Sequence, residues 1–466
     1  MQLPELRTAA DAAPGTLKAL AAHVRARRPA SYDRRVAEAR DYWHDRSGAH
    51  LAEDIRSTFS DGDIRQTVER SSITLPLVRR VVRKLARLYH AEPVRRVRPA
   101  GECAAHESSR DETERRYHRI ATAGELTETM RMAQELYTLT GLVYVRVGYD
   151  RGIFFEILGG DELLPALPPG APASDVGRYH SLLVPRTGGD GRAEYVFWSD
   201  RLHFVFDSEG RITGDFGDPA LENPYGRIPF VRIDGRTGEL FPDPPESLVR
   251  VNRVLNFALT ELFYTIKFQC FGQPVWVSDE NVAPDFKVGV QHLIHVVKRD
   301  QAAAGDFRFE SPDAPVGPVK ETVFEVARLA ALLEGVPADT VDARGRVESG
   351  VARWLAQADS REIHAAEVAR FRTAERHIFR TVAAVLAHHE PGAPLGTDQF
   401  TLETDFADPA PPLNPGEEHG ADEADLRLGV ISPADLLRRR NPDLARLSEE
   451  EILSLWRRNR ELAREP

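Results

Sequence analysis

The chain has 466 residues, 42% hydrophobic and 29% charged, with a formal net charge of −11, which excludes a disordered chain and fits two or three folded domains. Its two cysteines, Cys103 and Cys270, form neither a metal-ligand spacing nor a disulfide framework, which indicates a reducing compartment. Neither a signal peptide nor a membrane span is expected, because no basic-then-apolar start is present and no apolar stretch reaches about twenty residues.

The first 92 residues are expected to be helical. Residues 31–45 and 74–93 carry apolar side chains at helical spacing, and Pro93 ends the second segment. The apolar face of that second helix comprises Leu77, Val81, Val82, Leu85 and Leu88. Residues 100–117 are polar and are expected to form a loop or a short exposed helix, before a helix near 124–139.

The hydrophobic pattern then changes to a period of two. Residues 141–158 predict two strands around a tight turn at Asp150-Arg151-Gly152, and further short strands extend an antiparallel β-rich region across 140–234. The glycine-rich stretch "RTGGDGR" at 186–192 lies between strands, so it predicts a hairpin loop and not a phosphate cradle.

Two apolar helices flank an extended module in the next part of the chain. The segment 246–272 is apolar on more than one face and is expected to be buried on several sides. Candidate strands follow at 273–279 and 290–300, and a second apolar helix at 319–335 is stopped by Gly335 and Pro337.

A charged, glycine-containing loop precedes a helical pattern that ends before Pro391. This helix of about forty residues would be roughly 60 Å long at 1.5 Å per residue. In an isolated chain, this helix and the segment 246–272 would leave apolar surface in contact with water. Each Å² of such surface costs about 25 cal/mol of free energy relative to burying it. Packing against copies of the chain in a symmetric ring would cover that surface, and a large monomeric core is the alternative. A strand near 398–406 and C-terminal helices follow, the last with a capping box of Ser448 and Glu451.

The sequence offers little catalytic chemistry. It has no Walker A motif and no Gly-x-Ser-x-Gly elbow. His364 and Glu367 stand at i, i+3 on the long helix, and Glu375, His377, His388 and His389 follow on it. Such spacing can hold a metal, but no second helix supplies complementary His or Cys ligands. We therefore expect no catalytic residue, no metal and no cofactor, and a metal-dependent enzyme using His364 and Glu367 remains a minor alternative.

Taken in order, the segments resemble the portal (head–tail connector) family of tailed bacteriophages and related prophages, over nearly the whole chain. The resemblance rests on short segments in a shared order and not on one decisive motif. These are "ITLPLVRRVVRKLARLYHAEPV", "GLVYVRVGYDRGIFFEILGGDELLP", "ENPYGRIPFVRI", "VNRVLNFALTELFYTI", "VKETVFEVARLAALLEGVP", "ESGVARWL" and "GVISPADLLRRRNPDL". The extended module and the C-terminal region are shorter than the family pattern.

The resemblance implies an α+β, portal-type fold. Its parts would be a helical and β-rich wing, a two-helix stem, a small α/β clip, a long helix after a tunnel loop, and a helical C-terminal crown. The implied boundaries are 1–242 for the wing, 243–272 and 319–335 for the stem helices, 273–318 for the clip, 336–348 for the tunnel loop, 349–410 for the long wing helix and strand, and 411–466 for the crown.

The function implied by the resemblance is a ring, usually of twelve subunits in the virion, at one capsid vertex. Genomic double-stranded DNA would be packaged and ejected through its channel. The implied partners are other copies of the chain, the terminase large subunit, the head–tail adaptor, and the major capsid and scaffolding proteins, with no membrane. The protein would lie in the virion, and in the host cytoplasm during assembly. A helical scaffold or adaptor that forms no channel is the alternative function.

Residue roles follow from the same resemblance. The tunnel loop would face DNA with Asp339, Asp342, Arg344, Arg346 and Glu348. Stem packing would use Leu255, Leu259, Leu262, Phe263, Val326, Leu329 and Leu333.

The charge distribution is consistent with a conduit that does not grip DNA. Residues 1–100 carry 20 Lys and Arg against 12 Asp and Glu, and the rest of the chain carries 41 against 60. A mostly acidic wall with few basic points would let DNA slide, because each phosphate contact adds affinity. The simpler interpretation of the N-terminal basic excess is a solvated helix surface.

Overall fold

The computed structural model describes residues 6–100, 107–168, 170–189, 191–235, 239–271, 273–278, 294–297, 306–310, 316–333, 358–392, 395–396, 399–407, 415–441, 444 and 449–462. The chain divides into two units. The first comprises Met1–Gly345 and Asp359–Ala407, and the second comprises Arg346–Ala358 and Asp408–Pro466. Helices and antiparallel sheets occupy separate stretches of the chain, which confirms the α+β class.

The N-terminal part of the first unit is helical, as predicted. Its helices are α1 (Pro14–Ala26), α2 (Ala30–Trp43), α3 (Gly48–Thr58), α4 (Gly62–Arg70) and α5 (Leu77–Leu85), with short 3-10 turns η1 (Ala9–Asp11) and η2 (Leu88–His90). The helix predicted up to Pro93 is wrong at its end, because the backbone leaves the helical region at Ala86, where ψ is 77°. Val81 and Val82 therefore pack beside α2, while Leu88 turns into a different core.

Residues 100–117 were expected to form a loop or a short exposed helix, and over 107–117 the structure has a helix, which is longer than expected and partly buried. Helix α6 (Glu107–Ala123) is 17 residues long, and it precedes α7 (Leu126–Thr140). Tyr117 of α6 is fully buried and meets the ring of Phe379 edge-on at 4.9 Å. Tyr117, Ala121 and Ile120 dock the helix on the core that contains Phe379, and these few apolar positions among many charged residues give only a weak helical period.

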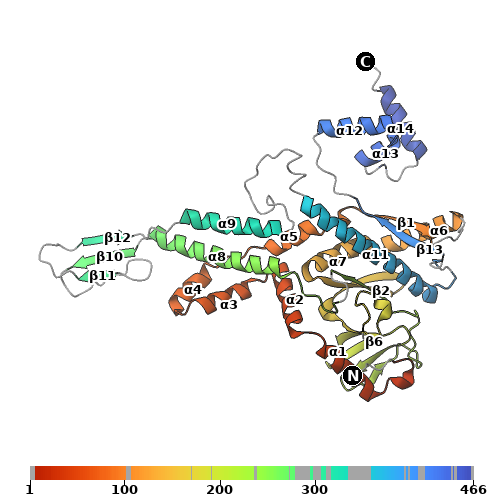
Figure 1. The fold of residues 1–466 in the computed structure, drawn as a ribbon, viewed down its shortest axis with the longest axis horizontal. Coiled ribbons are helices and arrows are strands. Elements are labelled where there is room, and N and C mark those ends of the chain that lie inside the picture. Colours follow the sequence, from red (N-terminus) through yellow and green to blue (C-terminus); the bar gives the residue numbers. More distant parts are fainter. Residues whose placement is uncertain are drawn as a thin grey trace. The chain divides into compact units, whose positions relative to one another are not determined.

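Two antiparallel sheets form the β-rich region and confirm its prediction (Figure 1). One sheet has the order β3-β2-β9, and the other has the order β4-β5-β6-β7-β8. The strands are β2 (Leu142–Tyr149), β3 (Ile153–Gly159), β4 (Leu164–Ala166), β5 (Ser181–Thr187), β6 (Ala193–Trp198), β7 (His203–Asp207), β8 (Ile212–Gly214) and β9 (Phe230–Asp234). Arg151 sits in the predicted β2–β3 turn with φ of 57°, and the stretch 186–192 joins β5 to β6 as a hairpin.

A two-stranded sheet joins distant parts of the chain. Strand β1 (Val94–Pro99) pairs antiparallel with β13 (Phe400–Asp405), so that Val94 faces Asp405. The long helix α11 is described over Ala358–His389, which is 32 residues, and residues 349–357 of the predicted helix lie outside the described residues. Its apolar side chains, including Phe371 and Phe379, share one core with α6, α7, β2 and β13.

The second unit is helical where it is described. It contains α12 (Pro415–Leu428), α13 (Pro433–Arg440) and α14 (Glu449–Leu462), which confirms the C-terminal helices. Ser432 caps α13, because its Oγ accepts the Asp435 N–H at 3.1 Å while the Asp435 carboxylate accepts the Ser432 N–H at 3.0 Å. The capping box predicted at Ser448 lies outside the described residues.

Candidate assembly interface

Helices α8 (Glu246–Phe271) and α9 (Val316–Leu333) lie side by side and carry a small sheet beyond their ends (Figure 1). The sheet has the order β11-β10-β12, from β10 (Gln273–Ser278), β11 (Ile294–Val297) and β12 (Asp306–Glu310). Strand β10 pairs parallel with β11 and antiparallel with β12. The first two strands were predicted, whereas the alternating charged and aromatic residues of β12 were missed.

The face of α8 toward α9 is apolar. Leu255 of α8 and Val323 of α9 are the buried centre of this contact, and Val251, Ala258, Leu259 and Leu77 pack around them. These α8 residues recur every three or four positions, so they lie on one side of the helix. The contact is thin, because Val323 is the one apolar residue of α9 that is buried within the described residues.

A ladder of polar side chains binds another face of α8 to the extended segment that precedes α5. Asn252 accepts a hydrogen bond from the Val78 N–H at 3.1 Å and donates to the Leu75 carbonyl at 3.0 Å. Asn256 accepts from the Leu75 N–H at 2.9 Å, and Thr260 accepts from the Ile73 N–H at 3.2 Å. All three side chains are buried. They provide the hydrogen-bond partners of backbone groups that would otherwise stay unpaired.

Arg253 adds an ionic contact beside this ladder. Its guanidinium lies 2.7 Å from an Asp54 oxygen on α3 and 3.0 Å from a Glu38 oxygen on α2. The hydrogen bond to Asp54, followed by its charge and that of Glu38, raises the pKa of Arg253, so the cation is retained at every ordinary pH. The base of α8 is therefore tied to three N-terminal segments.

Helix α9 exposes an apolar stripe that the described part of the chain does not cover. Val319 is 43% exposed, Val326 is 41% exposed and Leu329 is 52% exposed. Their spacing of seven and then three residues places them on one face of the helix. Phe324 on another side of α9, and Val254 and Phe263 on α8, are exposed as well. Adjacent helices with this much uncovered apolar surface are typical of a protein interaction site.

The predicted stem residues fall into two groups. Leu255 and Leu262 are buried within the chain, and Leu259 is partly buried against α9. Phe263, Val326 and Leu329 are exposed, and the side chain of Leu333 lies outside the described residues. The five predicted DNA-facing residues, Asp339, Asp342, Arg344, Arg346 and Glu348, also lie outside them. The Asn252, Asn256 and Thr260 ladder was missed, although its regular spacing of four residues could have signalled a buried polar stripe.

The carboxylates of the metal hypothesis have partners other than its histidines. Glu375 is buried in an ion pair with Arg95, at 2.8 Å, and accepts the Tyr89 hydroxyl at 3.0 Å. Glu367 instead faces Gln134, whose amide donates to it at 2.7 Å. His388 and His389 join a group of aromatic rings near Tyr225. Over the part of the chain that the structure describes, no three potential metal ligands come together.

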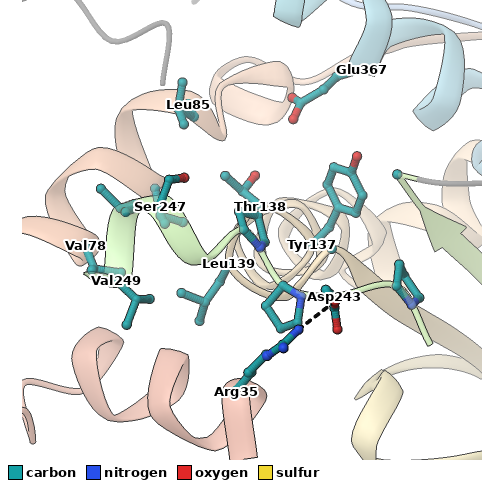
Figure 2. A pocket seen from close by; sticks show the side chains of 17 residues that line it. Arg35, Val78, Leu85, Tyr137, Thr138, Leu139, Asp243, Ser247, Val249 and Glu367 are labelled. Atoms are coloured by element: carbon teal, nitrogen blue, oxygen red, sulfur yellow. Dashed lines mark ion pairs between the residues drawn. The ribbon is translucent and has the colours of Figure 1, made fainter. Parts of the chain in front are cut away.

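A cavity of about 710 Å³ lies at the base of α8 and includes Glu367 (Figure 2). Side chains of α5, α7 and α8 line it, and Arg35 and Asp243 form an ion pair at 2.6 Å on its wall. Burial raises the pKa of Glu367 to about 7, against the opposing effects of Gln134 and Arg370. The cavity therefore contains one carboxyl group that titrates near neutral pH among largely apolar walls.

No described helix is both long enough and apolar enough to span a membrane.

Comparisons with known proteins give structural likenesses alone. No protein-family model matches the chain, and no curated protein matches it. A chain in the neck of an empty GTA particle resembles it at 14% identity with a TM-score of 0.42, covering 82% of this chain and 94% of that one. A chain in the virion of a native gene transfer agent (GTA) particle resembles it at 16% identity with a TM-score of 0.37, covering 82% and 93%. The likeness is partial at these TM-scores.

Proposed function

We propose that the chain is a portal protein, a ring-forming conduit at a capsid vertex through which double-stranded DNA is packaged and ejected. The observation that carries this proposal is the uncovered apolar stripe of α9, on a helix pair that ends in a small sheet. The order of segments in the sequence supports it. The second function considered from the sequence, a scaffold or adaptor without a channel, would use the same face for a single partner.

A ring accounts for the stripe in a simple way. Removing apolar surface from water contributes about 25 cal/mol per Å² of free energy. A monomer that leaves three aliphatic side chains half-exposed lacks that stabilisation. In a closed ring, each copy covers the stripe of its neighbour with a different face, and no copy is left uncovered. The tie between α8 and the N-terminal helices would hold the hairpin at a fixed angle for this contact.

The proposal assigns parts of the chain to roles. Residues 243–272 and 319–335 would be the stem, 273–318 the clip that binds terminase and later the head–tail adaptor, and 336–348 the loop that faces DNA. The wing, 1–242 with 349–410, and the crown, 411–466, would contact the capsid and scaffolding proteins. The energy for DNA movement would come from the terminase, since the sequence has no Walker A motif.

Assembly of the full-length protein tests this function. We expect annular particles by negative-stain electron microscopy and one closed oligomer by native mass spectrometry at micromolar concentration. Leu329→Glu places a charge on the stripe and should dissociate the ring, lowering its affinity by at least about tenfold, because a charge is buried without a partner. Lys320→Gln makes the same change in net charge away from the stripe and should leave the ring intact.

The alternatives give different results in the same experiment. A stable monomer at high concentration would contradict the ring, and a dimer without annular particles would favour the adaptor. Equal loss of assembly in Leu329→Glu and Lys320→Gln would show that net charge, and not the apolar stripe, controls association.

A further inference from the structure

A second cavity, of about 640 Å³, lies away from the α8–α9 hairpin, within the first unit. Its walls come from the β2–β3 hairpin, from β6 and β7, from the loop 215–225, and from His388 and His389 at the end of α11. We name it the aromatic cavity, because rings from all of these elements line it. Neither the proposed ring nor the DNA-facing loop uses it.

The rings of the aromatic cavity stack in series. His203 lies between Trp198, at 3.4 Å between ring centroids, and Phe216, at 4.0 Å, with nearly parallel planes in both pairs. Tyr225 is almost parallel to Trp198 at 6.1 Å. Tyr149 stacks on His389 at 4.2 Å, and the Tyr225 hydroxyl lies 3.0 Å from His389 Nε2. Aromatic rings from several elements therefore line the cavity, and the side chain of Phe216 is the most exposed of its phenylalanine, tyrosine and tryptophan rings.

The loop that carries Phe216 is held in an uncommon backbone conformation. Phe216 has φ of 52°, in the left-handed region that a bulky residue rarely adopts, and its side chain is 59% exposed. The Asp215 carboxylate accepts the Gly217 N–H at 3.0 Å, and Asp218 accepts the Ala220 N–H at 3.0 Å and the Glu222 N–H at 2.9 Å. The fold therefore keeps an exposed phenyl ring over His203 at a cost in backbone strain.

Charge around the cavity is unbalanced. Asp215, Asp218 and Glu222 line it, and none of them has an ion pair within the described residues. Arg146 also lines it and is paired with the Glu156 carboxylate at 3.0 Å, although its charge still acts on His203 and Tyr225. Three histidines line the cavity, and two of them, His203 and His389, have lowered pKa values. Burial lowers the pKa of His203 to about 4, and burial followed by the charge of His388 lowers the pKa of His389.

We propose that the aromatic cavity binds an arginine side chain carried by a segment of another protein. Aromatic faces attract cations, and a guanidinium is flat, so it can stack on Tyr225, Trp198 or Phe216 while its N–H groups reach the carboxylates. A nucleobase would also stack there, but the phosphates attached to it would meet three unbalanced carboxylates. The volume exceeds that of one side chain, which favours an arginine together with its neighbours in a peptide.

Binding of a capped peptide, Gly-Ser-Arg-Ser-Gly, to the full-length protein tests this inference. We expect saturable binding by calorimetry and a change in the emission of Trp198, with at least about tenfold weaker binding of the citrulline peptide, which keeps the shape and loses the charge. A lysine peptide should bind several-fold more weakly than the arginine peptide, because ammonium does not stack as a plane. Affinity should fall with added salt.

Variants locate the site. Phe216→Gly removes the ring and suits the left-handed backbone, and the double change Asp218→Asn with Glu222→Gln removes two charges. Each should weaken binding about three- to tenfold. Glu92→Gln changes an exposed carboxylate elsewhere in the first unit and should have no effect. Circular dichroism and native mass spectrometry check that the fold and the oligomer are retained, which separates this inference from the ring.

Three outcomes would overturn the proposal. These are no saturable binding of the arginine peptide, equal binding of its citrulline or lysine counterpart, and binding that survives both Phe216→Gly and the loss of the two carboxylates.

Discussion

Two glutamates about two turns apart on α11 have different partners. Glu375 is held by the Arg95 guanidinium through two hydrogen bonds of 2.9 and 2.8 Å, and both side chains are buried. Glu367 is buried against the neutral amide of Gln134. Burial of its carboxylate outweighs the effects of Gln134 and Arg370, so Glu367 keeps its proton to a higher pH than an exposed glutamate.

The proton on Glu367 links stability to pH. Its pKa rises from 4.5 to about 7 on folding, so the folded chain binds a proton that the unfolded chain has released. This contribution is fully present below pH 4.5 and is lost as the pH rises through about 7, at a cost of about 3 kcal/mol at most. Glu367→Gln keeps an acceptor for Gln134 and should flatten the decline in unfolding free energy between about pH 5 and about pH 8.

Urea denaturation across that range measures the effect, with the variant more stable than the parent at the alkaline end. Glu403→Gln is the control, because the hydrogen bond and charge of Arg98 lower the pKa of this exposed carboxylate. It titrates below the range, so its variant should keep the slope of the parent. An unchanged slope in Glu367→Gln would show that Glu367 is already ionised in the folded protein.

At the scale of elements, α8 is fixed by polar side chains more than its sequence suggests. The asparagines were expected to interrupt an apolar helix. Asn252 and Asn256 are instead buried, and their side chains accept hydrogen bonds from backbone N–H groups of the segment 73–78. Helix α8 also makes two apolar contacts next to this polar stripe, one with α9 and one with α5.

Removing one rung of the ladder should weaken this attachment. Asn252→Ala leaves the Val78 N–H and the Leu75 carbonyl unpaired inside the protein, so we expect a loss of about 1–3 kcal/mol in unfolding free energy. Thr265→Ala on the same helix is the control. Its hydroxyl bonds only to the Glu261 carbonyl of the preceding turn, and the change should stay within about 0.5 kcal/mol. Equal effects of the two changes would show that the ladder contributes nothing specific.

Elements with a strong period were predictable from sequence, and those defined by distant partners were not. Helix α7 and the β2–β3 hairpin follow directly from apolar spacing and a turn. The end of α5 at Leu85 could not be predicted in this way. Leu88 keeps the helical spacing of the apolar residues, but it packs into another core. Strand β1 was missed since its arginine-rich sequence becomes a strand only beside β13. Val326 and Leu329 of the α9 stripe were predicted as packing residues by resemblance and Val319 was not, and the exposure of all three depends on tertiary structure.

For the whole molecule, the loop between the stem and α11 is the part that would meet DNA. Shortening residues 338–347 should leave ring formation intact and impair DNA packaging, because the removed residues include none of the apolar stripe, whose last member is Leu329. The measurements are annular particles by microscopy and protected genome length in assembled particles. Shortening the 188–192 turn between β5 and β6 is the control for a general defect. Unimpaired packaging by the shortened loop would contradict its role.

The pairing of β1 with β13 affects how the protein is made. Val94 meets Asp405, and the core beneath this sheet also needs Phe371 and Phe379 of α11. A nascent chain that has emerged only as far as α9 therefore holds α6 and α7 without the helix that covers them, while the α8–α9 hairpin is already complete. Non-local pairing of this kind is slow and leaves apolar surface open during synthesis. Residues 358–405 complete this core, so translation presents the α9 stripe of the proposed ring before the first unit can finish folding.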